Sequence, residues 1–184
     1  MEQKEVEKIL EENLKKSKKT IVIAPGGIDY TTNDNIINYL LKKNNKIAWM
    51  TLSFPARILI KRLELTKKQI NNLIFIDGAS EEKKSEKVKG SFNIDYPESL
   101  ASLSKGVTEL LDSGQKINLF FCESIGTVLS NNKPENVKLF MKYLIKKLNE
   151  HGIEYIIFSL KEQIYHAYGE SIKPIFDKEI FLLE

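Results

Sequence analysis

The sequence predicts an α/β domain of three layers, with helices on both faces of a mostly parallel β-sheet. Short apolar runs alternate with amphipathic helical patterns along the chain, which is the order of repeated βαβ units. The chain has 184 residues, of which 42% are hydrophobic. This is enough for a single domain spanning 1–184 with a full core, and no internal repeat or domain boundary interrupts the pattern.

The N-terminal segment 1–17 is expected to contain a helix at 3–17. Val6, Leu10 and Leu14 fall on one stripe at helical spacing, and most of the other side chains are charged. A stripe of this kind has to be covered by other apolar groups. Either the same domain covers it, or the helix is an interface element against a neighbouring subunit.

The next elements alternate between strand and helix. The first strand is expected at 20–24, where 21–24 are a continuous apolar run, as in a buried parallel strand. The helix at 32–43 follows residues that are good N-caps. A second strand is expected at 46–51 and a third at 72–77. Between them Pro55 stands near the first turn of another helix, where its missing N–H costs little.

The C-terminal half continues this alternation, and its two longest apolar stripes predict helices. The expected elements are a polar surface loop at 79–90, a short edge strand at 92–94, a helix at 97–112, a strand at 117–122, a helix at 134–149, a strand at 155–159 and a closing strand or hairpin at 175–183. Parallel sheets bind ligands outside the C-terminal ends of their strands. The segments that follow the strands are 25–32, 51–55, 77–80, 122–127 and 159–163.

The first of these segments lies where a nucleotide-binding protein carries its phosphate loop. Residues 24–33 read APGGIDYTTN, without the lysine and the second glycine of the G-x-x-x-x-G-K-[ST] motif. Two interpretations remain. The backbone N–H groups and hydroxyls of Gly26, Gly27, Thr31 and Thr32 form an anion- or nucleotide-binding loop, or the glycines serve only the turn from strand to helix.

Further segments carry a family resemblance. Residues 47–55 read IAWMTLSFP, an apolar strand that ends in a Thr-Leu-Ser motif with a nearby proline, and 119–124 read LFFCES, an apolar strand that ends in Glu-Ser. An irregular stretch at 126–133 then precedes the helix at 134–149. In this order, over roughly residues 18–162, the chain resembles the RecA-like ATPase domain of the KaiC and RadA group. The resemblance implies a RecA-like, P-loop-NTPase-like fold.

The chain departs from that resemblance at the positions that would carry ATP hydrolysis. The lysine that grips the phosphates is missing, and Asp29 would repel them. Ser53 stands where the resemblance implies a carboxylate that activates water. We therefore expect a degenerate P-loop and no catalytic residues, as in a pseudo-ATPase, with ATP or ADP and Mg²⁺ as the alternative ligands of the loop.

Three side chains at the expected ligand-binding edge each have two interpretations. Glu123 stands where the family resemblance implies an aspartate after an apolar strand. It is either a vestigial metal ligand or a carboxylate that accepts loop N–H groups. Asp77, before Gly78, is either a ligand carboxylate or part of a turn. Cys122 is either a nucleophile or a buried core thiol, and the absence of a nearby histidine favours the core thiol.

Composition narrows the remaining function classes. The net charge is only +3 and the only arginines are Arg57 and Arg62, which gives weak support for nucleic-acid binding. No apolar run approaches the roughly 20 residues of a membrane span, and one cysteine suits a reducing cytoplasm. The expected function is that of a regulatory or signalling adaptor acting through a protein partner or self-association. The alternatives are a nucleotide- or phosphate-binding ATPase-like domain and an accessory factor in DNA repair or recombination.

Overall fold

The computed structural model describes residues 2–15, 19–25, 31–43, 46–79, 88–95, 99–162 and 173–182. Its α-helices are α1 (Gln3–Leu14), α2 (Thr31–Lys42), α3 (Ala56–Arg62), α4 (Lys67–Ile70), α5 (Leu100–Asp112), α6 (Ile125–Asn131) and α7 (Pro134–Glu150). Its strands are β1 (Lys19–Ala24), β2 (Ile47–Thr51), β3 (Leu73–Asp77), β4 (Phe92–Asn93), β5 (Leu119–Cys122), β6 (Glu154–Leu160) and β7 (Lys178–Phe181), and a 3-10 turn η2 (Lys173–Ile175) precedes the last strand.

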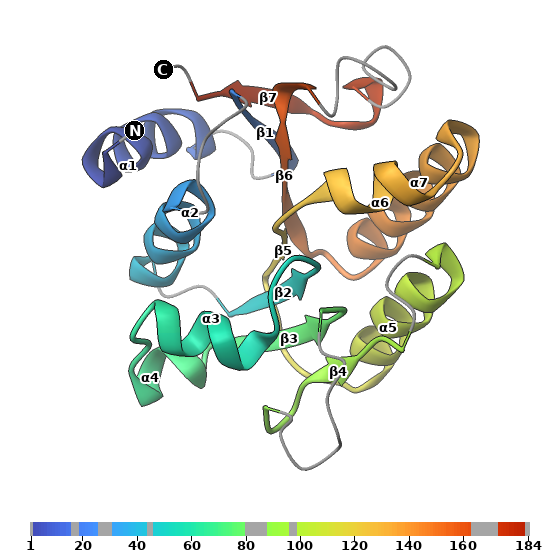
Figure 1. Ribbon diagram of the computed structural model, residues 1–184, viewed down its shortest axis with the longest axis horizontal. Coiled ribbons are helices and arrows are strands. Elements are labelled where there is room, and N and C mark those ends of the chain that lie inside the picture. Colours follow the sequence, from blue (N-terminus) through green and yellow to red (C-terminus); the bar gives the residue numbers. More distant parts are fainter. Residues whose placement is uncertain are drawn as a thin grey trace.

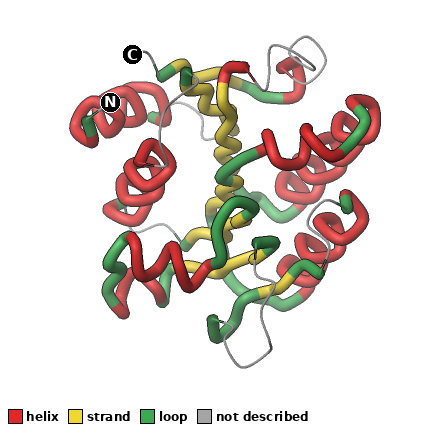
Figure 2. Tube along the Cα trace, in the orientation of Figure 1, coloured by secondary structure: helices red, strands yellow, loops and turns green. Residues whose placement is uncertain are grey.

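The described strands form one sheet in the order β4-β3-β2-β5-β6-β1-β7, and all their pairings are parallel. The sheet stands edge-on in Figure 1, with α1 to α4 on one side and α5 to α7 on the other. The yellow strands of Figure 2 run between these two groups of red helices. The three-layer α/β fold predicted from the sequence is confirmed.

Each face of the sheet builds its own apolar core because side chains alternate along a strand. In β1, Ile21 and Ile23 belong to the core that includes α5, α6 and α7, whereas Val22 and Ala24 belong to the core that includes α1, α2 and α3. Both sets are buried. This explains why the strands read as continuous apolar runs in the sequence.

The helix α1 packs on its own domain. Val6, Leu10 and Leu14 are buried in the same core as α2. Ion pairs join the two helices at their exposed edges, with 2.6 Å from Lys42 Nζ to Glu7 Oε1 and 3.0 Å between Lys43 and Glu11. The apolar stripe at the start of the sequence is therefore covered from within the chain.

The structure corrects two details of the expected elements and decides between the two alternatives for the closing segment. The stretch 126–133, expected to be irregular, contains most of helix α6. The short helix α4 was not predicted, and begins with a capping box in which Thr66 and Gln69 satisfy each other's backbone N–H groups. The closing segment is one strand, β7, parallel to β1. The expected surface loop at 79–90 falls mostly on residues 80–87, outside the described residues.

Candidate functional site

Glu123 lies directly after β5, at the edge of the sheet where its C-terminal strand ends meet. Its carboxylate oxygen Oε1 accepts the backbone N–H groups of Leu52 at 2.9 Å and Ser53 at 2.7 Å. The residue is only 2% exposed. Glu123 therefore holds the connection between β2 and α3, which accords with a carboxylate that satisfies loop N–H groups.

Burial raises the pKa of Glu123 above its ordinary value. The N–H groups of Ser53, Leu52 and Phe54 and the positive charge of Arg62 act in the opposite direction, but do not cancel the effect of burial. The carboxylate is thus kept out of water and compensated mainly by backbone donors. Such an environment stabilises a loop, and it opposes the water-filled coordination that Mg²⁺ usually retains in proteins.

Asp77, at the end of β3 on the other side of β2, likewise accepts backbone N–H groups. Its Oδ2 accepts the N–H of Ala56, the first residue of α3, at 2.8 Å. Its Oδ1 accepts the N–H of Ala79 at 3.1 Å and lies 3.5 Å from the hydroxyl of Thr51. The carboxylate, 3% exposed, therefore supports both the turn after β3 and the start of α3.

The start of α2 reaches the same edge of the sheet. The side-chain amide of Asn33 donates a hydrogen bond to the carbonyl oxygen of Glu123 at 3.1 Å. Thr32 is 1% exposed, and its hydroxyl has no hydrogen-bond partner in the part of the chain described. The sequence had singled out Gly26, Gly27, Thr31 and Thr32. Both threonines are in the first turn of α2, while both glycines lie outside the described residues.

An ion pair joins α2 to α3. Arg62 makes an ion pair with Asp34 at 2.5 Å, and its guanidinium lies 4.8 Å from the centre of the Phe54 ring. The sequence did not identify these partners of Arg62. The only available signal was the location of both segments after parallel strands, because such segments meet at one edge of the sheet.

A cysteine nucleophile and a metal site, the other candidates at this edge, find little support. Cys122 is buried, and desolvation raises the pKa of its thiol to about 12, so it is neutral and packed in the core. Among the described residues, no three His, Cys, Asp or Glu side chains gather where they could hold a metal ion. No helix in the same ranges is long and apolar enough to cross a membrane.

Comparison with known proteins places the fold. No protein-family model matches the chain, and no curated protein matches it in sequence. Among solved structures it is similar to the KaiC-like protein PH0186 from the hyperthermophilic archaeon Pyrococcus horikoshii OT3, with a TM-score of 0.59, 13% identity, and coverage of 90% of this chain and 71% of that one. It is also similar to a second solved structure, an ATPase domain, with a TM-score of 0.54, 8% identity, and coverage of 91% and 70%. The chain therefore has the RecA-like fold of these two proteins.

Proposed function

We propose that this protein is a RecA-like domain that does not hydrolyse ATP and acts as a regulatory or signalling adaptor through protein partners. The observation that carries the first half of this proposal is the environment of Glu123. One of its oxygens accepts two backbone N–H groups, and the residue is almost fully buried. A carboxylate engaged in this way is a poor ligand for a hydrated metal ion.

The residues around this edge support the same conclusion. Phosphoryl transfer depends on positive charge at the β- and γ-phosphates, on a metal ion, and on a group that orients the attacking water. The segment 24–33 contains no lysine or arginine, and Ser53, exposed at the end of β2, cannot act as a strong base near neutral pH. A retained fold without these groups favours a role in binding.

The direct test is steady-state phosphate release from ATP and Mg²⁺ by the purified chain and by its Glu123→Gln variant. We expect neither protein to release phosphate above a protein-free control. Release by the wild type that the substitution abolishes would overturn the proposal, because it would make Glu123 part of a hydrolytic site. Phosphate release that the substitution leaves unchanged would also overturn the claim of inactivity, because it would mean that the chain hydrolyses ATP without the Glu123 carboxylate.

A specific observation favours a second candidate, which is nucleotide or phosphate binding without hydrolysis. The buried Thr32 hydroxyl and the Asn33 side-chain oxygen have no hydrogen-bond partners among the described residues, and they occupy the first turn of the 12-residue helix α2. The N-terminus of a helix of this length attracts anions. Calorimetric titration with ATP, ADP and inorganic phosphate would test it. We expect binding that Thr32→Val weakens, and an absence of heat would exclude this candidate.

A further inference from the structure

The N-terminal ends of β2, β3 and β5, at the edge of the sheet away from Glu123, border a surface cleft of about 690 Å³. The described residues that line it belong to β3 or to the segments before β2, β3, β4 and β5. Its charged members are Lys46, Lys89 and Lys116, and no acidic residue of the described chain lines it. The cleft lies within the size range of small-molecule sites, about 300–1,000 Å³.

Backbone hydrogen bonds bring two of these lysines to neighbouring strands. The N–H of Lys46 donates to Oδ1 of Asn118 at 2.8 Å, and the carbonyl oxygen of Lys46 accepts the N–H of Asn118 at 3.0 Å. Lys116 is two residues before Asn118, so the parallel pairing of β2 with β5 places both lysines at the same end of the sheet. Two like charges placed in this way repel each other, and an anion bound between them removes the repulsion.

A tight turn brings the third lysine to the cleft. The N–H of Ser91 donates to the carbonyl oxygen of Val88 at 3.0 Å, and the Ser91 hydroxyl donates to the same oxygen at 2.8 Å. Gly90 completes the turn with a φ of 83°, a conformation that favours glycine. Lys89 is therefore held in the lining by a defined backbone conformation.

The positive charge of the cleft is not neutralised within the described chain. No ion pair between two described residues involves Lys46, Lys89 or Lys116. Asp112 at the end of α5 and Glu154 at the start of β6 are at the same end of the sheet, but neither lines the cleft. The C-terminus of α5 contributes roughly half a negative charge, which is too little to balance three lysines.

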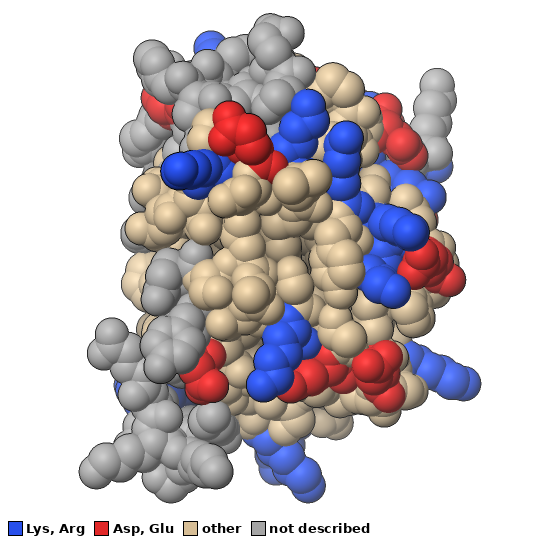
Figure 3. All heavy atoms as spheres, turned by 90° about the vertical axis from the view of Figure 1, so that its right-hand side faces the viewer, with Lys and Arg blue, Asp and Glu red and all other residues tan. Residues whose placement is uncertain are grey.

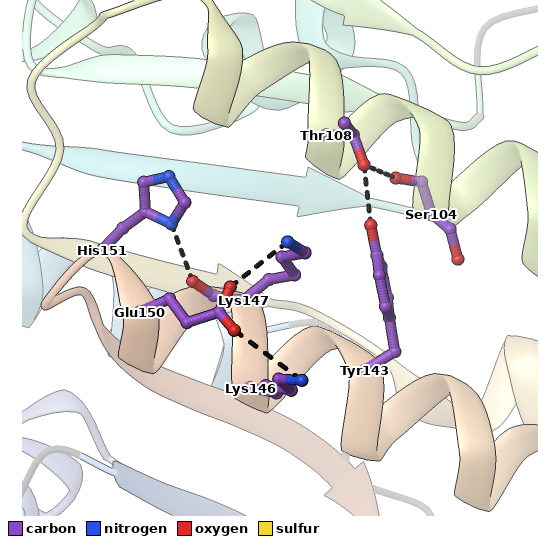
Figure 4. Close-up of polar contacts among 7 residues, drawn as sticks. All are labelled: Ser104, Thr108, Tyr143, Lys146, Lys147, Glu150 and His151. Carbon is purple, nitrogen blue, oxygen red and sulfur yellow. Dashed lines mark hydrogen bonds and ion pairs between the residues drawn. The ribbon is translucent and has the colours of Figure 1, made fainter.

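A second lysine-lined hollow, on α7, shows the opposite arrangement. Its lining includes Lys142 and Lys146, but also Glu150. Glu150 lies 3.9 Å from Lys146 and 3.2 Å from Lys147, and Figure 4 shows both contacts. Figure 3 shows this side of the molecule, with red acidic groups next to blue basic ones. The cleft at the strand starts differs because its described lining provides no carboxylate for its lysines.

We propose that this cleft binds a small molecule that carries a diphosphate or several phosphate groups. Lys46, Lys89 and Lys116 pair with the phosphate oxygens, for which a lysine ammonium is a suitable point charge. The side-chain amides of Asn72 and Gln115 supply hydrogen-bond donors and acceptors for the other polar groups of the ligand. The site is separate from the start of α2, and it depends neither on the adaptor function nor on the lack of hydrolysis.

The lining favours a small molecule over nucleic acid. Within the described ranges it contains no arginine that could fork onto a guanine and no aromatic ring on which a base could stack. Ile70, Ile74 and Val88 are half-buried in its wall. These aliphatic side chains suit the carbon skeleton of a small phosphorylated ligand.

The test is calorimetric titration of the purified chain with pyrophosphate, in a buffer free of phosphate. We expect saturable binding that weakens as the salt concentration rises. Lys46→Gln and Lys116→Gln should each weaken binding by about threefold or more, and the double variant by about tenfold or more. In ¹H–¹⁵N NMR spectra of the wild type, pyrophosphate should shift the amide signals of Gly90 and Gln115.

Lys142→Gln is the matched control. It removes another exposed lysine, from the α7 hollow that contains Glu150, and should leave the affinity for pyrophosphate unchanged. Because Lys46, Lys116 and Lys142 are all exposed, the three variants should fold normally, and circular dichroism would verify this. Citrate, titrated in the same way, separates phosphate from carboxylate recognition and should bind more weakly than pyrophosphate.

Four results would overturn the proposal. The first is an absence of saturable pyrophosphate binding, and the second is an affinity that the double variant leaves unchanged, with NMR shifts confined to the start of α2. Equal binding of citrate would contradict the choice of phosphate. Single-stranded DNA that binds more tightly than pyrophosphate, and that depends on Lys46 and Lys116, would replace the small molecule with nucleic acid.

Discussion

At the scale of single residues, two buried carboxylates organise one connection of the fold. Glu123 holds the N–H groups of Leu52 and Ser53, and Asp77 holds that of Ala56. The sequence placed both acids at the ligand-binding edge, because the ends of parallel strands meet there. It could not identify their partners, since these depend on β2 lying between β3 and β5 in the sheet.

Removing the Glu123 carboxylate should be costly. In Glu123→Ala the N–H groups of Leu52 and Ser53 lose their acceptor in a buried site, where an unsatisfied donor costs about 1–3 kcal/mol. We expect the free energy of unfolding to fall by about 2–4 kcal/mol. Urea unfolding can follow the fluorescence of Trp49, the only tryptophan and fully buried. Exposed Glu135→Ala is the control, and equal stability of the two variants would show that the carboxylate does not hold the loop.

The raised pKa of Glu123 predicts a pH dependence with a definite sign. Because burial puts the folded-state pKa above the unfolded one, the native state binds the proton more tightly. The resulting contribution to stability is complete below the unfolded-state pKa of about 4.3, and is lost as pH rises through the folded-state pKa. The stability of the wild type relative to Glu123→Gln should therefore fall from acidic to neutral pH. A difference that stays constant, or rises with pH, would contradict this assignment.

At the scale of elements, patterns that depend only on local sequence were predictable. The apolar stripes of α1, α5 and α7 and the apolar run of β1 correspond to observed helices and a strand. The short helices α4 and α6 were missed. Four residues give α4 too few turns for a periodic pattern. Helix α6 has seven residues, as many as the predicted α3, but no proline marks its start, and it is defined by burial of Ile125, Val128 and Leu129 against the sheet.

The helix α1 should behave as an integral part of the domain. Leu10 is fully buried in the core that contains α2, so Leu10→Ala leaves a cavity and should cost about 2–5 kcal/mol. Lys8→Ala, on the exposed face of the same helix, should change stability little. Thermal and urea unfolding would compare the two. If Leu10→Ala is as stable as Lys8→Ala, α1 does not contribute to the core in solution.

At the scale of the whole molecule, the order of elements was sufficient to predict the fold. The same order placed 47–55 and 119–124 on β2 and β5, which are neighbours in the sheet. Function follows less directly, because it depends on which atoms remain free at the edge of the sheet. Glu123 has the chemistry of a metal ligand in the sequence, yet in the structure its Oε1 is already occupied by backbone donors.

The most direct test of this account is a single-turnover measurement, with protein in excess over radiolabelled ATP and with Mg²⁺ present. Because a single event per molecule is counted, it detects hydrolysis far too slow for a steady-state assay. We expect ATP to persist as long as in protein-free buffer, for both the wild type and Glu123→Gln. Conversion to ADP that co-purifies with the wild-type chain and slows in Glu123→Gln would contradict the account, because it would place Glu123 in a working ATPase site.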